Sequence, residues 1–156
     1  MTFLTSFKKS NYLRSNSIFD IDFAPKQNSN ILTTRLLKTQ NFEKRQELAA
    51  KLLKNLSADA KISQVKLKIS ATRQWSKRRG RKTVFKLYGY YRPKTRYIYI
   101  QNLTSIRGKP VAAKTFLSTL LHEWLHHYDT EKLKLYSIHT KGFYFRLADL
   151  KHKLDL

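Results

Sequence analysis

The sequence predicts a single α+β domain, and three observations support this prediction. Apolar residues recur at helical spacing over residues 42–56, 113–128 and 141–154, and three β-prone segments lie between the first two of these helices. The resulting order α, β, β, β, α, α is typical of the α+β class. A chain of 156 residues, 41% of them hydrophobic, can also bury a core of its own. We therefore expect a small three-stranded antiparallel sheet packed on a central helix, with further helices at its flanks.

Residues 1–38 differ in composition from the rest of the chain. They mix Ser, Asn, Thr and Lys with scattered aromatic residues, and Pro25 favours a loop. We expect this segment to be a basic, weakly structured lead-in to a folded domain over residues 39–156. The first predicted helix of that domain starts after Asn41, a residue type that caps helices well.

Three strands are predicted after this helix. Apolar residues alternate with lysines and a serine over residues 65–71, which gives the segment one apolar and one wet face. The segments 84–91 and 96–101 are rich in Tyr, Phe and Ile, and Arg92 and Pro93 separate them. A basic turn is expected to join the first strand to the second.

Two more helices follow the strands. Pro110 stands where a helix can begin, and a broad apolar stripe then runs to Tyr128, which identifies this helix as the central one. The last helix is predicted over residues 141–154, with Thr140 as its cap.

The sharpest chemical motif is His122-Glu123-Trp124-Leu125-His126, within the central helix. Because four residues make just over one helical turn, both imidazoles leave the same face about 6 Å apart along the axis, a separation that one zinc ion can bridge. Glu123 is rotated by about 100° from His122, so it stays outside the ligand set but can reach a water on the metal as general base. The motif therefore predicts a zinc site with Glu123 as its catalytic residue.

A catalytic zinc ion needs a third protein ligand and an open position for water. The chain has no cysteine, so this ligand must be His, Asp or Glu. We predict His139, because the thirteen residues after His126 allow the helix to end and the next one to approach the metal. Asp149 and His152 remain alternatives, and His127 is disfavoured because adjacent helical positions point about 100° apart.

These residues resemble the SprT-like family, which includes the Spartan DNA–protein crosslink proteases. The resemblance covers roughly residues 60–150 and is carried by Leu120 to His126 after a small sheet, followed by His139 and Phe143. It implies a zincin-like protease fold in which His122, His126 and His139 bind zinc and Glu123 is the catalytic acid/base. The chain departs from the family in having Thr140 where a glycine is frequent, and in lacking the cysteine zinc ribbon of many members.

Positive charge is concentrated before the central helix. The chain has 32 Lys and Arg against 10 acidic residues, a net charge of +22, and no acidic residue lies between Ala60 and His122. Such a surface neutralises phosphates, so we predict binding to single-stranded or distorted DNA, or to RNA. The candidate contacts are Arg73, Trp75, Lys77, Arg78, Arg79, Arg81, Lys82, Arg92, Lys94 and Arg96, and the tyrosines at 88, 90, 91, 97 and 99 are candidates for base stacking.

The leading functional hypothesis is a zinc metallopeptidase that acts on nucleic-acid-associated proteins, as in DNA–protein crosslink repair. Its oxyanion donor is expected among His127, Tyr144 and Arg146. The main alternative is a non-catalytic DNA- or RNA-binding protein with a structural zinc site, and a third hypothesis is zinc-assisted hydrolysis of another substrate such as a phosphodiester.

Location and assembly follow from the same composition. No segment has the roughly 18–20 apolar residues that a membrane span needs, so we expect no membrane partner. We expect a monomer in the cytoplasm or nucleoid. Organellar targeting is the alternative, because the first 19 residues contain no acid and carry Lys8, Lys9 and Arg14 among several serines.

Overall fold

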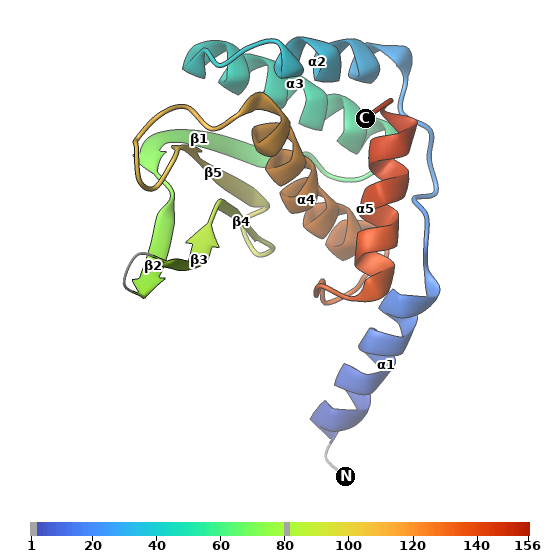
Figure 1. Cartoon of the computed structure of the whole chain (residues 1–156). Coiled ribbons are helices and arrows are strands. Elements are labelled where there is room, and N and C mark those ends of the chain that lie inside the picture. Colours follow the sequence, from blue (N-terminus) through green and yellow to red (C-terminus); the bar gives the residue numbers. More distant parts are fainter. Residues whose placement is uncertain (1–2, 80–81) are drawn as a thin grey trace.

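The computed structural model describes residues 3–79 and 82–156, with side chains for residues 4–74 and 88–156. The part of the chain that it describes is α+β, as predicted (Figure 1). Its helices are α1 (Phe3–Ser17), α2 (Gln27–Leu37), α3 (Phe42–Asp59), α4 (Ala113–Glu131) and α5 (Lys141–Lys153). Its strands are β1 (Lys66–Arg73), β2 (Trp75–Arg79), β3 (Lys82–Leu87), β4 (Gly89–Arg92) and β5 (Tyr97–Leu103).

The three-stranded sheet is mixed, and the prediction of a wholly antiparallel sheet was wrong. Its order is β1-β5-β4, with β4 antiparallel to β5 but β1 parallel to it. The chain can make this parallel pair because β4, which runs antiparallel to β5, returns the chain to the end of the sheet where β1 begins. Sequence periodicity defines which face of a strand is buried but carries no information about its direction.

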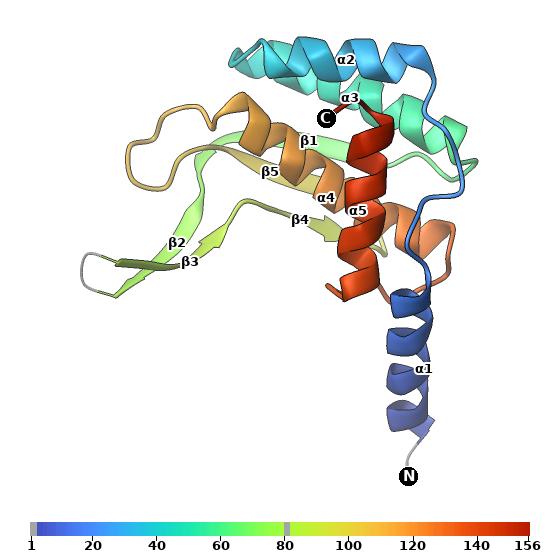
Figure 2. The ribbon, with the colours of Figure 1, turned by 45° about the vertical axis from the view of Figure 1, so that its right-hand side comes forward.

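The basic segment after β1 is also more regular than a turn. Residues 75–79 and 82–87 form an antiparallel two-stranded sheet, which projects away from the body of the molecule on the side opposite α1 (Figure 2). Lysine and arginine have low β propensity, so β2 gives no clear strand signal in the sequence.

Residues 1–38 contain two helices, in contrast to the weakly structured lead-in that we expected. Helix α2 packs along α3 and also contacts α4, burying Leu32 and Leu36 (Figure 1). Helix α1 extends from the body and contacts α5 near its own C-terminal end. These helices are rich in polar residues, and few of their residues face the core. Their sequences therefore show no clear helical pattern of apolar residues.

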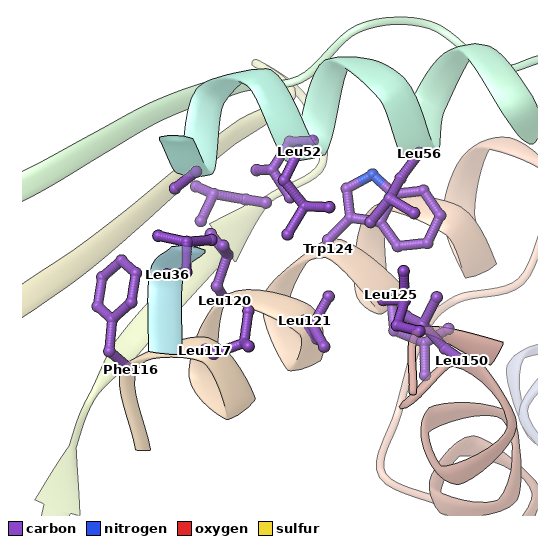
Figure 3. Close-up of a cluster of buried hydrophobic side chains, with 14 of the residues drawn as sticks. Leu36, Leu52, Leu56, Phe116, Leu117, Leu120, Leu121, Trp124, Leu125 and Leu150 are labelled. Carbon is purple, nitrogen blue, oxygen red and sulfur yellow. The ribbon is translucent and has the colours of Figure 1, made fainter. Parts of the chain in front are cut away.

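The core lies between α3, α4 and the inner face of the sheet. Trp124 is completely buried there, and its indole nitrogen donates a hydrogen bond to the Ser57 hydroxyl, 3.1 Å away. The same core cluster contains leucines from four helices, together with Phe116 (Figure 3): Leu36, Leu52, Leu56, Leu117, Leu120, Leu121, Leu125 and Leu150. This packing holds α4 by its apolar stripe, so the side chains on its remaining face are positioned relative to the sheet.

Two predicted helix caps are confirmed. The Asn41 side chain accepts a hydrogen bond from the Lys44 backbone N–H at the start of α3, and Thr140 accepts one from the Phe143 N–H at the start of α5. Among the described residues, no helix combines the length and the apolar character that crossing a bilayer requires.

The two edge strands of the three-stranded sheet differ in their hydrogen-bond partners. At the β1 edge, the Gln46 side chain of α3 accepts a hydrogen bond from the Ile69 N–H and donates one to the Leu67 carbonyl, so it occupies the place of a further strand. Strand β4 forms the other edge, and in the described chain it pairs with β5 alone. The sheet therefore leaves the β4 edge open for pairing.

Candidate metal centre

Helix α4 presents His122 and His126 from the same face, as the one-turn spacing predicts. Their imidazole rings lie 5.0 Å apart between centroids, and both rings are partly exposed. The helix is fixed in rotation by Trp124 and Leu125, which are completely buried on its opposite side. The core residues thus set the direction in which the two imidazoles project.

The structure brings His139 to this pair. Its Nε2 atom lies 2.9 Å from Nε2 of His122 and 3.0 Å from Nε2 of His126, and the three residues form a group that can hold a metal ion. His139 stands in the loop directly before the cap of α5, rather than in the first turn of that helix.

The two alternative ligands are not part of this group. The Asp149 carboxylate accepts a hydrogen bond from the Ile21 N–H and pairs with Lys153, and His152 is exposed on α5. Among the described residues, only the three histidines at 122, 126 and 139 converge in this way.

The spacing of the three nitrogens fits a small tetrahedral ion. Zinc–nitrogen bonds of 2.0–2.1 Å in tetrahedral geometry place two ligand nitrogens about 3.3 Å apart. The Nε2 separations of 2.9 and 3.0 Å are within a few tenths of an ångström of that value.

Phe143 forms the apolar floor of the histidine cluster. It is completely buried, and its ring centroid lies 4.6 Å from that of His126, 5.0 Å from that of His122 and 5.3 Å from that of His139. Burial lowers the pKa of His122 to about 4 and that of His126 to about 3. Both rings are therefore neutral near pH 7, the state in which imidazole binds a metal.

A chain of hydrogen bonds orients the His126 ring from behind. Its Nδ1 atom lies 2.7 Å from the Ser137 hydroxyl, which donates to the Asp129 carboxylate at 3.2 Å. Because the carboxylate only accepts and the hydroxyl has one proton, the Ser137 oxygen must accept its second bond from Nδ1–H. The proton is thereby fixed on Nδ1, and the lone pair of Nε2 is directed at the cluster.

Asp129 is held in turn by Arg146, and both side chains are completely buried. The guanidinium donates to the two carboxylate oxygens at 3.0 and 2.7 Å, and also to the backbone carbonyls of Ser15 and Ile18 at the end of α1. Helix α1 approaches α5 this closely because position 142 is glycine: a Cβ there would lie 2.0 Å from the Ser15 carbonyl oxygen. Our sequence reasoning missed Ser137, Asp129 and the contribution of α1, because none of them belongs to a motif.

His127 belongs to a separate, fully paired environment. It is completely buried, and its Nε2–H donates to the Ser63 carbonyl at 2.7 Å while its Nδ1 accepts from the Tyr91 hydroxyl at 2.9 Å. Both nitrogens are occupied, so His127 ties α4 to β4 and to the loop before β1. It is not available as a ligand or as an oxyanion donor.

Glu123 faces a cleft beside the histidine cluster. The cleft has a volume of about 390 Å³, and its walls are β4 and the loop that leads to His139. Glu123 is 8% exposed and, among the described residues, makes no hydrogen bond or ion pair. Burial raises the pKa of its carboxyl to about 7. A carboxyl group in this state can take up and release a proton near neutral pH.

The predicted nucleic-acid contacts fall into three groups. Arg92 and Lys94 are exposed at the end of β4 and in the turn that follows, whereas Arg96 pairs with Glu131 at 2.9 Å and Arg73 lies against Gly108. Trp75, Lys77, Arg78, Arg79 and Lys82 belong to the strands β2 and β3, where only the backbone is described. Arg81 lies outside the described residues.

Comparison with known proteins identified no relative of the chain. No protein-family model, curated protein or solved structure matches the chain.

Proposed function

We propose that the chain is a zinc-dependent metallopeptidase of the SprT-like type that acts on proteins associated with nucleic acid. One observation carries the catalytic part of this proposal. Three imidazole Nε2 atoms converge at the side of an open cleft that also contains the unpaired carboxylate of Glu123. A structural zinc site is closed by four protein ligands, whereas a catalytic site has three and keeps a position for water. The three-histidine set beside a cleft favours the catalytic alternative.

The open edge of β4 supports a peptide as the substrate. Gly89, Tyr90 and Tyr91 line the cleft opposite the histidines, and β4 pairs with β5 on its other side. An extended peptide can add to such an edge as a further strand, using its backbone groups irrespective of its sequence. A substrate bound in this way would lie in the cleft that Glu123 also lines.

The chain's own residues would divide the chemistry as follows. His122, His126 and His139 would hold the zinc ion, which polarises a carbonyl group and activates water for attack. Glu123 would take the proton of the attacking water and return it to the leaving amine. Phe143 and the neighbouring leucines would exclude bulk water from one side of the site, which strengthens its electrostatic interactions.

Tyr144 is the remaining candidate for the oxyanion donor. Arg146 is buried in its ion pair with Asp129, and both nitrogens of His127 are paired. The Tyr144 side chain is 52% exposed, and its ring lies 5.9 Å from that of His139. Tyr144 does not line the cleft itself, and its hydroxyl would reach a substrate from beside His139.

The nucleic-acid part of the proposal rests on charge. The net charge of +22 exceeds the magnitude of about 2–8 that suits a small soluble domain, and β4, the strand that borders the cleft, carries no acidic residue. Basic side chains near the cleft would concentrate proteins that are bound to nucleic acid.

The first experiment compares Glu123→Gln with Glu131→Gln on the same helix. Glutamine keeps the size of Glu123 but cannot act as a base, so casein hydrolysis by the zinc-loaded protein should fall at least a hundredfold. Zinc content should be unchanged, because Glu123 lies outside the histidine cluster. Glu131 pairs with Arg96 and does not line the cleft, so its variant should retain activity.

Chelation and readdition of zinc complete this test. The wild-type protein should lose hydrolysis with chelator and regain it with zinc. Hydrolysis that survives either the chelator or Glu123→Gln would exclude the proposed mechanism. A wild-type protein that binds zinc but cuts no protein substrate would favour the non-catalytic alternative.

A further inference from the structure

The outer face of the three-stranded sheet carries an ordered array of tyrosines and cations. Helices α3 and α4 pack on the inner face, and no helix of the described chain packs on the outer one. The strand register places Lys68, Tyr99 and Tyr90 side by side in one row across the sheet. The adjacent row contains Lys66, Tyr97 and Arg92 in the same order. We call these six residues the tyrosine platform.

The alternation of the strands places all six side chains on one face. Ile98 and Ile100 of β5 are completely or almost completely buried, whereas the tyrosines between and beside them are only partly buried. On β1, Ile69 lies in the core and Lys66 and Lys68 are exposed. The platform is therefore accessible to a ligand in solution.

Two of the tyrosine rings are already stacked. The rings of Tyr90 and Tyr99 are 5.1 Å apart at an interplanar angle of 16°, and the Arg92 guanidinium lies 4.9 Å from the centre of the Tyr90 ring. The Tyr99 hydroxyl is hydrogen-bonded to Thr72 at 3.2 Å, which restricts the ring further. Binding of a flat ligand that extends this stack would cost the protein little conformational entropy, because the rings are already ordered in the free protein.

The charge of the face restricts the chemistry of its ligand. Lys66, Lys68 and Arg92 contribute three positive charges, and β1, β4 and β5 contain no acidic residue. Glu131, at the end of α4, is paired with Arg96 of the turn before β5. A ligand that combines flat aromatic rings with regularly spaced negative charges would match both features.

We propose that the tyrosine platform binds single-stranded nucleic acid. Unpaired bases would stack on Tyr90, Tyr97 and Tyr99, and the phosphates would contact Lys66, Lys68 and Arg92. Base-paired duplexes keep their base faces covered, so the platform selects the single-stranded form. This inference deepens the proposed function, on which it rests for its biological role: Tyr90 also lines the peptidase cleft, so a strand bound here would hold its attached protein at the cleft entrance.

The test measures binding of a fluorescein-labelled dT15 oligonucleotide by fluorescence anisotropy, using the full chain. The double variant Tyr90→Leu/Tyr99→Leu removes the stacking rings and should weaken binding about tenfold or more. Tyr90→Phe/Tyr99→Phe keeps both rings and should bind within about twofold of the wild type. The matched control is Tyr12→Leu on α1, which removes an exposed tyrosine outside the platform.

Lysine variants test the phosphate contacts without a risk to the fold, because both side chains are exposed. Lys66→Gln/Lys68→Gln should weaken binding and reduce the slope of log Kd against log salt concentration by about 0.7 per lysine. Lys8→Gln/Lys9→Gln on α1 removes the same charge elsewhere and should leave the slope closer to that of the wild type.

The outcomes separate this inference from the peptidase. Three outcomes would each overturn the inference. The phenylalanine and leucine variants could lose affinity equally, or the wild type could bind a duplex of the same length with equal affinity. The third is a leucine variant that is folded by circular dichroism and binds the oligonucleotide with unchanged affinity. Platform variants that instead lose binding to anionic phospholipid vesicles, with oligonucleotide binding unchanged, would assign the face to a membrane. Because anisotropy needs no zinc, a failed peptidase assay leaves this result intact, and failed binding leaves the Glu123 test intact.

Discussion

His126 and His127 are neighbours in sequence on α4, yet their ring nitrogens are hydrogen-bonded in different ways. On the His126 side, one ring nitrogen is hydrogen-bonded to Ser137 and the other is directed at the histidine cluster. On the His127 side, both nitrogens are paired and the ring is completely buried. The hydrogen-bond partners also fix opposite tautomers, with the proton on Nδ1 of His126 and on Nε2 of His127. Partner geometry therefore decides which histidine can bind a metal.

The same contrast between paired and unpaired polar groups extends along the helix. The paired groups also include Tyr128, whose hydroxyl donates to Asp22, and the buried Asp129–Arg146 pair, which supports His126 through Ser137. The cleft side contains Glu123, for which the described residues provide no partner. Substitutions of the paired groups should therefore lower stability, whereas those of the groups that face the cleft should change metal binding or activity and leave stability equal or higher.

The largest effect is expected for Arg146→Met. Methionine fills much of the same space but leaves the Asp129 carboxylate buried without its partner, which costs about 3–5 kcal/mol. Urea denaturation of the metal-free protein measures this loss. Arg35→Met on α2 changes an exposed arginine and should alter the free energy of unfolding by about 0.5 kcal/mol or less.

A second variant separates the ion pair from the space that it fills. Adding Asp129→Leu to Arg146→Met removes the orphaned charge and should recover part of the lost stability. If Arg146→Met alone unfolds at the wild-type urea concentration, the paired groups do not hold the fold in the way that we describe.

The next effect concerns metal affinity rather than folding. Ser137→Ala removes the acceptor that holds the proton on Nδ1 of His126, so zinc affinity should fall about tenfold, or about 1.4 kcal/mol. Competition with a chromogenic chelator measures it. Thr130→Val is the matched control, because Thr130 lines the same cleft but its hydroxyl donates to a backbone carbonyl of its own helix. Equal zinc affinity in wild type and Ser137→Ala would show that the ring needs no such support.

The sequence predicted the parts of the site that depend on local geometry. The separation of His122 and His126 follows from the pitch of a helix, and the caps at Asn41 and Thr140 follow from local hydrogen bonding. His139 was predicted as the third ligand from a plausible loop length, and the structure brings it to the pair.

The parts that were missed depend on contacts between distant segments. Arg146 meets the end of α1 across more than 125 positions of sequence, and the parallel pairing of β1 with β5 depends on the return of the chain through β4. Neither feature leaves a periodic pattern. His127 shows the same limit, because its position in the sequence does not reveal that Ser63 and Tyr91 occupy both its nitrogens.

The smallest effect tests the cleft side and has the opposite sign. A buried carboxylate without a hydrogen-bond partner costs stability, and an apolar side chain of similar length avoids that cost. Glu123→Met should therefore raise the free energy of unfolding of the metal-free protein by about 1 kcal/mol. Glu131→Met, which removes a partner of Arg96 at the surface, should leave it unchanged or slightly lower. A loss of stability in Glu123→Met would mean that the carboxylate contributes to the fold, and the contrast between the paired and the unpaired polar groups of α4 would no longer hold.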